Sequence, residues 1–118
     1  MTRAQLSVTR AAVAQCGGAI ARLTPLLQAN ARGPAAKAAT EAHFLCSAAL
    51  ARITPAIGSH GALDPCRQSL ILLERFTSRE VAALDVAAAD TQAAAVSAFD
   101  AAIEQQRACD VALAAPPR

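Results

Sequence analysis

The sequence predicts an all-α protein folded as an antiparallel, up-down-up-down four-helix bundle. Three observations lead to this fold class. Alanine, the best helix former, dominates the composition, whereas aromatic residues make up only 3% of the chain. Apolar side chains recur at steps of three and four along four segments, and proline, glycine and capping residues separate those segments. At 118 residues, we expect one domain spanning residues 1–118.

The first predicted helix covers residues 3–31. Its core-facing seam, spaced by three and four, comprises Leu6, Thr9, Val13, Cys16, Ile20, Leu23 and Leu27. Gly17 and Gly18 weaken this helix locally because glycine is a poor helix former. The run Arg32-Gly33-Pro34 supplies the chemistry of a helix stop followed by a turn.

The second predicted helix covers residues 34–54 and ends before Pro55. Its apolar face comprises Ala39, His43, Cys46, Leu50 and Ile53. A turn-rich segment at residues 58–61 follows. Asp64-Pro65 then has the pattern of an N-cap followed by proline at the first helical position, which predicts a third helix from Pro65 to about residue 89.

The third and fourth helices carry one ambiguity. Thr77-Ser78-Arg79-Glu80 matches a capping box, which would break the third helix near Thr77. The apolar stripe continues across this site, so we favour an unbroken helix. Asp90-Thr91 is the next cap signal, and Pro116-Pro117 ends the fourth helix.

An internal repeat links the first two helices at an offset of thirty residues. Residues 16–27 (CGGAIARLTPLL) and 46–57 (CSAALARITPAI) are identical at six of twelve positions. The match includes a cysteine, an arginine and a Thr-Pro pair, and the aliphatic positions correspond as well. A duplicated helical hairpin is one interpretation, and coincidence of helical spacing in an alanine-rich chain is the other.

Each predicted helix contains one cysteine, and the four are candidates for two disulfides. Cys16 and Cys46 lie at similar distances from the turn at Arg32-Gly33-Pro34, and small residues follow both, so we predict that they are neighbours. Cys66 and Cys109 match less closely in depth. Disulfides would suit a small domain with a thin core, whereas buried free thiols are the alternative.

The localisation stays open. Residues 1–5 lack the apolar run of a signal peptide, which favours the cytoplasm. The even number of cysteines favours an exported mature chain nearly as strongly. We expect no membrane span, because charged or polar residues interrupt every apolar stretch.

Charge is distributed unevenly between the two halves of the chain. Residues 1–59 carry six basic side chains and one acidic, a net charge of +5, whereas the remainder carries five basic and eight acidic, a net −3. The two flanks would attract each other, or Arg3, Arg10 and Arg22 would form a face for an anionic partner. Basic clusters interleaved with aromatic residues are absent, so we expect no nucleic-acid partner.

Histidine and cysteine residues raise two further hypotheses. His43, Cys46, His60 and Cys66 are zinc-ligand types, but their spacing matches no common zinc module, so we expect no metal site. Residues 42–47 (AHFLCS) resemble the histidine phosphotransfer domains, helical bundles of this size with a phospho-accepting histidine. That resemblance implies His43 as the phospho-acceptor. Cys46 and Ser47 replace the lysine and glycine of that pattern, which removes a positive charge and open space beside the imidazole.

A second resemblance covers residues 62–113. Residues 62–66 (ALDPC) and 107–109 (RAC) bracket two predicted helices, and this arrangement resembles the plant invertase and pectin methylesterase inhibitors. Those proteins are secreted four-helix bundles with a disulfide between such helices. This chain has no N-terminal cysteine hairpin and has Cys16 and Cys46 in addition.

No phosphate-binding glycine loop, nucleophile elbow or Cys-x-x-Cys motif is present, so we expect no enzyme, no catalytic residues and no cofactor. We expect a soluble, non-enzymatic interaction protein, such as an inhibitor, a secretion-associated factor or an adaptor. It would bind a protein partner, or itself as a homo-oligomer, through a helix face. The alternatives are phosphotransfer through His43, and carriage of a small ligand or metal in the bundle core.

Overall fold

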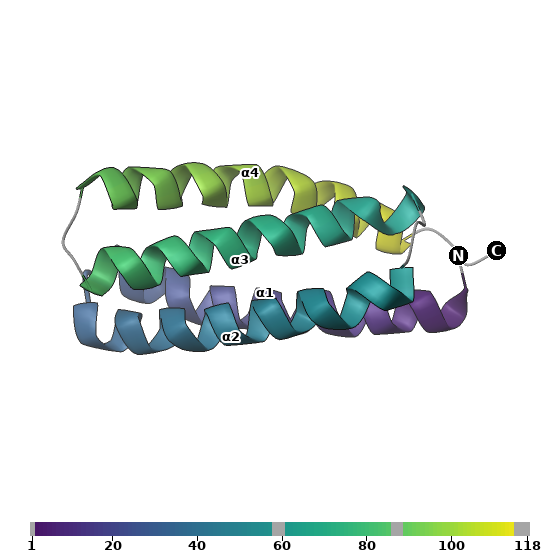
Figure 1. Cartoon of the computed structure of the whole chain (residues 1–118), viewed down its shortest axis with the longest axis horizontal. Helices are drawn as coiled ribbons and strands as arrows, with labels where there is room; N and C mark the ends of the chain where they lie inside the picture. The colour runs from purple at the N-terminus through teal and green to yellow at the C-terminus, as the bar shows by residue number, and fades with distance from the viewer. Residues whose placement is uncertain (1, 58–60, 86–88, 115–118) are drawn as a thin grey trace.

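The described part of the chain is almost entirely helical. The computed structural model describes residues 2–57, 61–85 and 89–114, with side chains described for 2–57, 61–81 and 99–114. Its elements are α1 (Arg3–Gln28), α2 (Arg32–Ile57), the 3-10 turn η1 (Gly61–Leu63), α3 (Asp64–Asp85) and α4 (Ala89–Ala114). Successive helices run antiparallel (Figure 1). The predicted all-α four-helix bundle is confirmed, and no strand occurs within these ranges.

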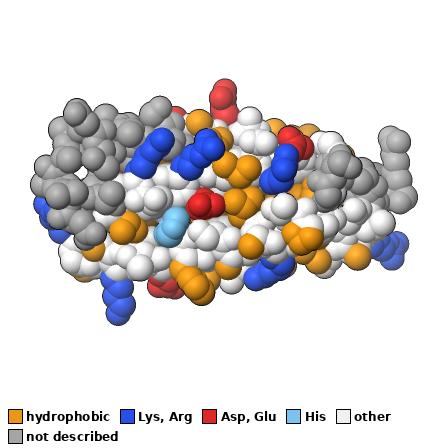
Figure 2. Space-filling view, viewed as in Figure 1, with side chains coloured by type: hydrophobic (Ala, Val, Ile, Leu, Met, Phe, Trp, Pro, Cys, Tyr) orange, Lys and Arg blue, Asp and Glu red, His pale blue; other side chains and the backbone are white. Residues whose placement is uncertain are grey.

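The helices form an elongated rod of 48 × 21 × 20 Å. The most extensive packing joins α1 to α2, α2 to α3 and α3 to α4, so two helical hairpins meet through α2 and α3 (Figure 1). The guanidinium of Arg10 on α1 donates to the backbone carbonyl of Leu113 on α4. Charged side chains of both signs lie on the face shown in Figure 2, with apolar atoms between them.

Hydrogen bonds at both ends of α1 explain its bounds. At the start, Thr2 and Gln5 form a capping box: Thr2 Oγ1 accepts from the Gln5 amide, and Gln5 Oε1 accepts from the Thr2 amide. At the end, Asn30 adopts a φ of 54°, a left-handed conformation that asparagine tolerates. The amides of Asn30 and Ala31 donate to the carbonyls of Leu27 and Leu26, a Schellman motif.

This motif corrects the predicted turn. Because Asn30 ends α1, the helix stops at Gln28 and α2 already begins at Arg32, so the turn lies before Arg32-Gly33-Pro34 rather than within it. Pro34 occupies the first turn of α2, where a helix needs no backbone donor.

α2 also extends beyond its predicted end at Thr54. Pro55 removes one backbone hydrogen bond, yet the helix continues to Ile57. Ile57 is buried, and burying an isoleucine side chain contributes about 1.5–3 kcal/mol, which offsets the cost of the missing bond. α1 likewise continues past Pro25 in its last turn.

α3 is continuous through Thr77, as favoured, and the capping-box interpretation is wrong. Thr77 Oγ1 lies 2.9 Å from the carbonyl oxygens of both Leu73 and Glu74, so it bonds back into its own helix. Thr77 and Glu80 are buried because residues three apart share a helix face. The described part of α3 ends at Asp85 and α4 begins at Ala89, so the passage from the third helix to the fourth lies outside the described residues.

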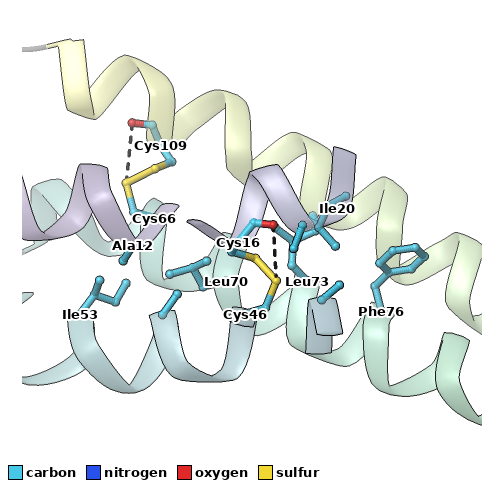
Figure 3. Packing of buried hydrophobic residues seen from close by; sticks show 14 of the residues in the cluster. Ala12, Cys16, Ile20, Cys46, Ile53, Cys66, Leu70, Leu73, Phe76 and Cys109 are labelled. Atoms are coloured by element: carbon cyan, nitrogen blue, oxygen red, sulfur yellow. Dashed lines mark hydrogen bonds between the residues drawn. A yellow bond between two sulfur atoms is a disulfide. The ribbon is translucent and has the colours of Figure 1, made fainter. Parts of the chain in front are cut away.

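The core consists mainly of small side chains at the helix contacts and of leucine and isoleucine between them (Figure 3). Among the side chains that the structure describes, the buried alanines are Ala12, Ala19, Ala35, Ala39, Ala42, Ala49 and Ala102. Alanine permits close helix packing but buries little surface per residue. One aromatic pair joins α3 to α4, with the rings of Phe76 and Phe99 4.9 Å apart between centroids.

We predict that replacing Gly17 by alanine stabilises the protein. A Cβ atom built on Gly17 has no neighbour within 4 Å, and one on Gly18 is only in ordinary contact with Arg22 Nη1 at 3.9 Å. Each Gly→Ala substitution should therefore raise the free energy of unfolding by about 0.5–1 kcal/mol through helix propensity. Urea denaturation followed by circular dichroism measures this change. The exposed Ala14→Gly is the matched reverse control, and destabilisation by Gly17→Ala would show that its site is closed.

Candidate functional site

A disulfide closes each helical hairpin. Cys16 and Cys46 join α1 to α2, and Cys66 and Cys109 join α3 to α4; in each pair the Cα atoms lie 4.5 Å apart. All four cysteines are fully buried (Figure 3). The expected proximity of Cys16 and Cys46 agrees with this structure, and the looser sequence match of Cys66 and Cys109 also corresponds to a pair.

Small side chains and chain reversal together bring Cys16 and Cys46 into contact. The reversal at Asn30 lies almost midway between them in sequence, so they reach the same level of the hairpin. Alanines one turn away on each helix, Ala12 and Ala49 among them, are fully buried at this contact. Gly17, one of the small residues that follow the cysteines, does not contribute to this close approach, because a Cβ atom built on it has no neighbour within 4 Å.

The sulfur atoms also lie against backbone carbonyls, at 3.8 Å from Cys46 Sγ to Cys16 O and 3.7 Å from Cys66 Sγ to Cys109 O (Figure 3). A disulfide sulfur has no proton to donate, so these are packing contacts. Cys46 and Cys66 are therefore committed to disulfides and do not join His43 in a zinc site. Among the described residues, no group of three or more potential ligands is positioned to hold a metal.

Residues at matching positions of the sequence repeat make matching contacts. Arg22 on α1 pairs with Glu41 on α2 at 3.3 Å, and Arg52 on α2 donates to Gln15 on α1 at 2.9 Å. Thr24 and Thr54 each donate to the carbonyl four residues earlier. Each arginine thus ties its helix to the other helix of the hairpin. A common origin of the two helices stays a prediction.

The three arginines expected to form an anionic-partner face lie on α1, and two of them contact other helices. Arg10 reaches toward α4 and donates to Leu113, whereas Arg22 reaches in another direction, to Glu41 on α2. Arg3 is exposed near the start of α1. The Leu113 carbonyl has no charge to offset that of Arg10, whereas Arg22 lies beside the carboxylate of Glu41. An anionic partner for this face stays a prediction.

A polar cluster lies where the two hairpins meet. It consists of His43 on α2 and Thr77 on α3, whose Nδ1 and Oγ1 atoms are 3.2 Å apart. Thr77 and its neighbour Glu80, one turn further along α3, are both 0% exposed, whereas His43 is half-buried. Histidine atoms reach the surface of the face in Figure 2, near acidic and basic side chains. The imidazole is therefore held on its inner edge and accessible on its outer one.

The sequence analysis did not predict that Thr77 and Glu80 are buried. Thr77 and Glu80 were assigned to a capping box, although both fall on the helix face that also carries Leu70 and Leu73. Their shared spacing of three and four residues was the available signal. His43 was expected on the apolar face of its helix, and it lies at the edge of that face.

Two large apolar side chains are exposed. Phe44 on α2 is 71% exposed and Val111 on α4 is 75% exposed. Phe44 is offset by about half a helical turn from its buried neighbours Ala42 and Cys46, so it points away from the core. The helical pattern agrees with this placement, since Phe44 lies outside the predicted apolar face that includes His43 and Cys46.

Comparison with known protein families, curated proteins and solved structures returned no match to this chain. Within the described helices, none has a stretch long and apolar enough to cross a membrane.

We predict that each disulfide stabilises the fold substantially. The bridges close loops with sequence separations of 30 and 43 residues, and for such loops the loss of unfolded-state entropy corresponds to about 3–4 kcal/mol each. The paired variants Cys16→Ala/Cys46→Ala and Cys66→Ala/Cys109→Ala should lower the free energy of unfolding by that amount. Urea titration of the oxidised protein measures it, with peptide mapping as the control for pairing. Free thiols in the oxidised, folded protein would contradict the assignment.

Proposed function

We propose that this chain is a non-enzymatic interaction protein that binds a protein partner through the outer face of α2. The observation that carries the proposal is the exposure of Phe44 on the side of the helix opposite the core. Burial of a phenylalanine side chain in a partner's pocket contributes about 1.5–3 kcal/mol. Aromatic side chains of this kind often dominate the energy of a protein interface.

The surroundings of Phe44 support docking of another protein. Thr40 and Ala48 lie one turn away from Phe44 on the same side of α2, and Ala51 lies two turns away. Their small side chains leave Phe44 prominent. The Thr40 hydroxyl already donates to the carbonyl of Ala36, so its burial would leave no donor unsatisfied. Glu41, which lies on the flank of this face, is turned toward Arg22 on α1.

The disulfides support the same function in two ways. A hairpin held by Cys16 and Cys46 presents Phe44 on a rigid helix, which reduces the entropy lost on binding. Two disulfides also fit a protein that matures in an oxidising compartment, where an interaction protein needs to keep its shape without a large core. We therefore favour an exported chain over a cytoplasmic one.

We predict that Phe44→Ala weakens partner binding by about tenfold to thirtyfold, which corresponds to about 1.4–2 kcal/mol. Because the side chain is exposed, the free energy of unfolding should change by less than about 0.5 kcal/mol. A photo-crosslinking residue at position 44 identifies the partner in the source cells, and calorimetric titration then measures the affinity.

Val111→Ala is the matched control, because Val111 is equally exposed but on α4. It should leave the affinity unchanged. Sedimentation equilibrium of the same proteins tests self-association, in which case Phe44→Ala should shift the oligomer toward monomer. Equal binding by Phe44→Ala and the parent would contradict the proposal for this face.

A second candidate function is phosphotransfer through His43. The observation in its favour is the half-buried imidazole held through Nδ1 by a buried hydroxyl. Incubation with phosphoramidate, followed by peptide mass spectrometry under non-acidic conditions, tests it, with His43→Gln as the control. Absence of a phosphoryl group on His43 would argue against this candidate and leave the interaction function unaffected.

A further inference from the structure

We propose that Thr77 is a positioning residue that holds the neutral His43 ring as the Nδ1–H tautomer and so makes Nε2 its nucleophilic atom. The phosphoryl chemistry drawn from this rests on the second candidate function, whereas the tautomer itself follows from the hydrogen bonds alone. The group to be accepted is a phosphoryl group from a small phosphoramidate donor.

The first step assigns the single proton of the Thr77 hydroxyl. Oγ1 lies 2.9 Å from the carbonyl oxygens of Leu73 and Glu74, and carbonyls only accept hydrogen bonds. The same donation to the carbonyl four residues earlier is made by Thr9, Thr24, Thr40 and Thr54. The proton of Thr77 is thus committed to its own helix.

The hydrogen bond to Thr77 determines which nitrogen of His43 is protonated. With its proton committed, Thr77 Oγ1 can only accept a hydrogen bond from Nδ1 at 3.2 Å, so Nδ1 carries a proton. Thr77 is 0% exposed, which keeps water from competing for this bond. A neutral imidazole has one N–H group, and its other nitrogen, Nε2, therefore has the free lone pair.

The third step concerns access to Nε2. Nδ1 contacts the fully buried Thr77 hydroxyl, so this nitrogen is turned to the interior, and the ring as a whole is half-buried. The accessible edge of the ring is accordingly the edge that contains Nε2. The fixed ring orientation also reduces the entropy lost when a reactant approaches.

The chemistry balances without another reactant. The Nε2 lone pair forms a bond to the phosphorus of phosphoramidate, whose nitrogen is already protonated, and the P–N bond breaks as ammonia leaves with its electron pair. The ring gains the phosphoryl group on Nε2 and keeps its proton on Nδ1. The resulting positive charge is shared over the ring while Thr77 Oγ1 continues to accept the Nδ1–H bond.

The direct test is nitrogen NMR of the full-length protein labelled with 15N-histidine, in a His60→Gln background so that one ring remains. At about pH 8.5, where an imidazole is neutral, Nδ1 of His43 should have the chemical shift of a protonated nitrogen and Nε2 that of an unprotonated one. A parent spectrum dominated by the Nε2–H form would overturn the proposal before any variant is made.

Variants separate positioning from packing. Thr77→Val, which keeps the shape but removes the acceptor, should shift the ring toward the Nε2–H form that free histidine prefers, whereas Thr77→Ser should retain Nδ1–H. Thr54→Val removes an equivalent hydroxyl far from His43 in sequence and should have no effect. Circular dichroism checks that each variant is folded. An unchanged tautomer in folded Thr77→Val would refute the role of Thr77.

The reaction is then followed with phosphoramidate alone. A phosphoryl group on Nε2 would support the proposal, and one on Nδ1 would overturn it. If the NMR shows the Nδ1–H form and no phosphoryl transfer occurs, positioning by Thr77 holds and the phosphotransfer function fails. The two failures are thereby distinguishable.

Discussion

Close contact between alanine-lined helix faces is the constraint on which the rest of this structure depends. Only small side chains allow the cysteine Cα atoms of paired helices to approach to 4.5 Å. The same small side chains bury little apolar surface, so the core alone provides modest stabilisation. The disulfides offset this deficit by restricting the unfolded chain rather than by adding contacts to the folded one. The alanine-rich helix contacts thus both allow the disulfides to form and make their stabilisation necessary.

The junction between the hairpins has a different character. No disulfide joins α2 to α3, and at this seam the buried Thr77 lies beside the half-buried His43. Burying a hydroxyl group is costly unless it is hydrogen-bonded, and Thr77 meets this condition through the carbonyls of its own helix and through His43 on α2. The contact with His43 therefore requires that α2 and α3 keep this alignment.

The sequence was sufficient for the fold class and for the number and approximate limits of the helices. Alanine content and the spacing of apolar residues indicate the helices over many positions, so a misinterpreted single residue does not change the predicted fold. Helix ends depend on one or two residues instead. Asn30 ended α1 through a left-handed conformation that a search for glycine and proline overlooks, and burial of Ile57 outweighed the signal of Pro55.

The candidate sites show the same division. The pairing of Cys16 with Cys46 was predictable from the number of residues between each cysteine and the turn, because residues equally far from the turn lie side by side in any antiparallel hairpin. The roles of Thr77 and Glu80 are harder to predict, since a capping box and a buried polar pair have the same local sequence. Only their spacing of three and four residues with Leu70 and Leu73 distinguishes the buried pair. Arg10 and Arg22 were counted as one surface, and only tertiary contacts with Leu113 and Glu41 show that they face different helices.

The positions of the two cross-links also determine how this molecule responds to a pulling force. A chain stretched from its ends would first separate the two hairpins at α2 and α3, since no covalent bond resists there. The loops between Cys16 and Cys46 and between Cys66 and Cys109 would stay closed, which removes roughly 250 Å from the length that the extended chain could reach. Under tension the protein therefore extends as a chain that contains two disulfide-closed loops, and only the residues outside these loops can be fully stretched.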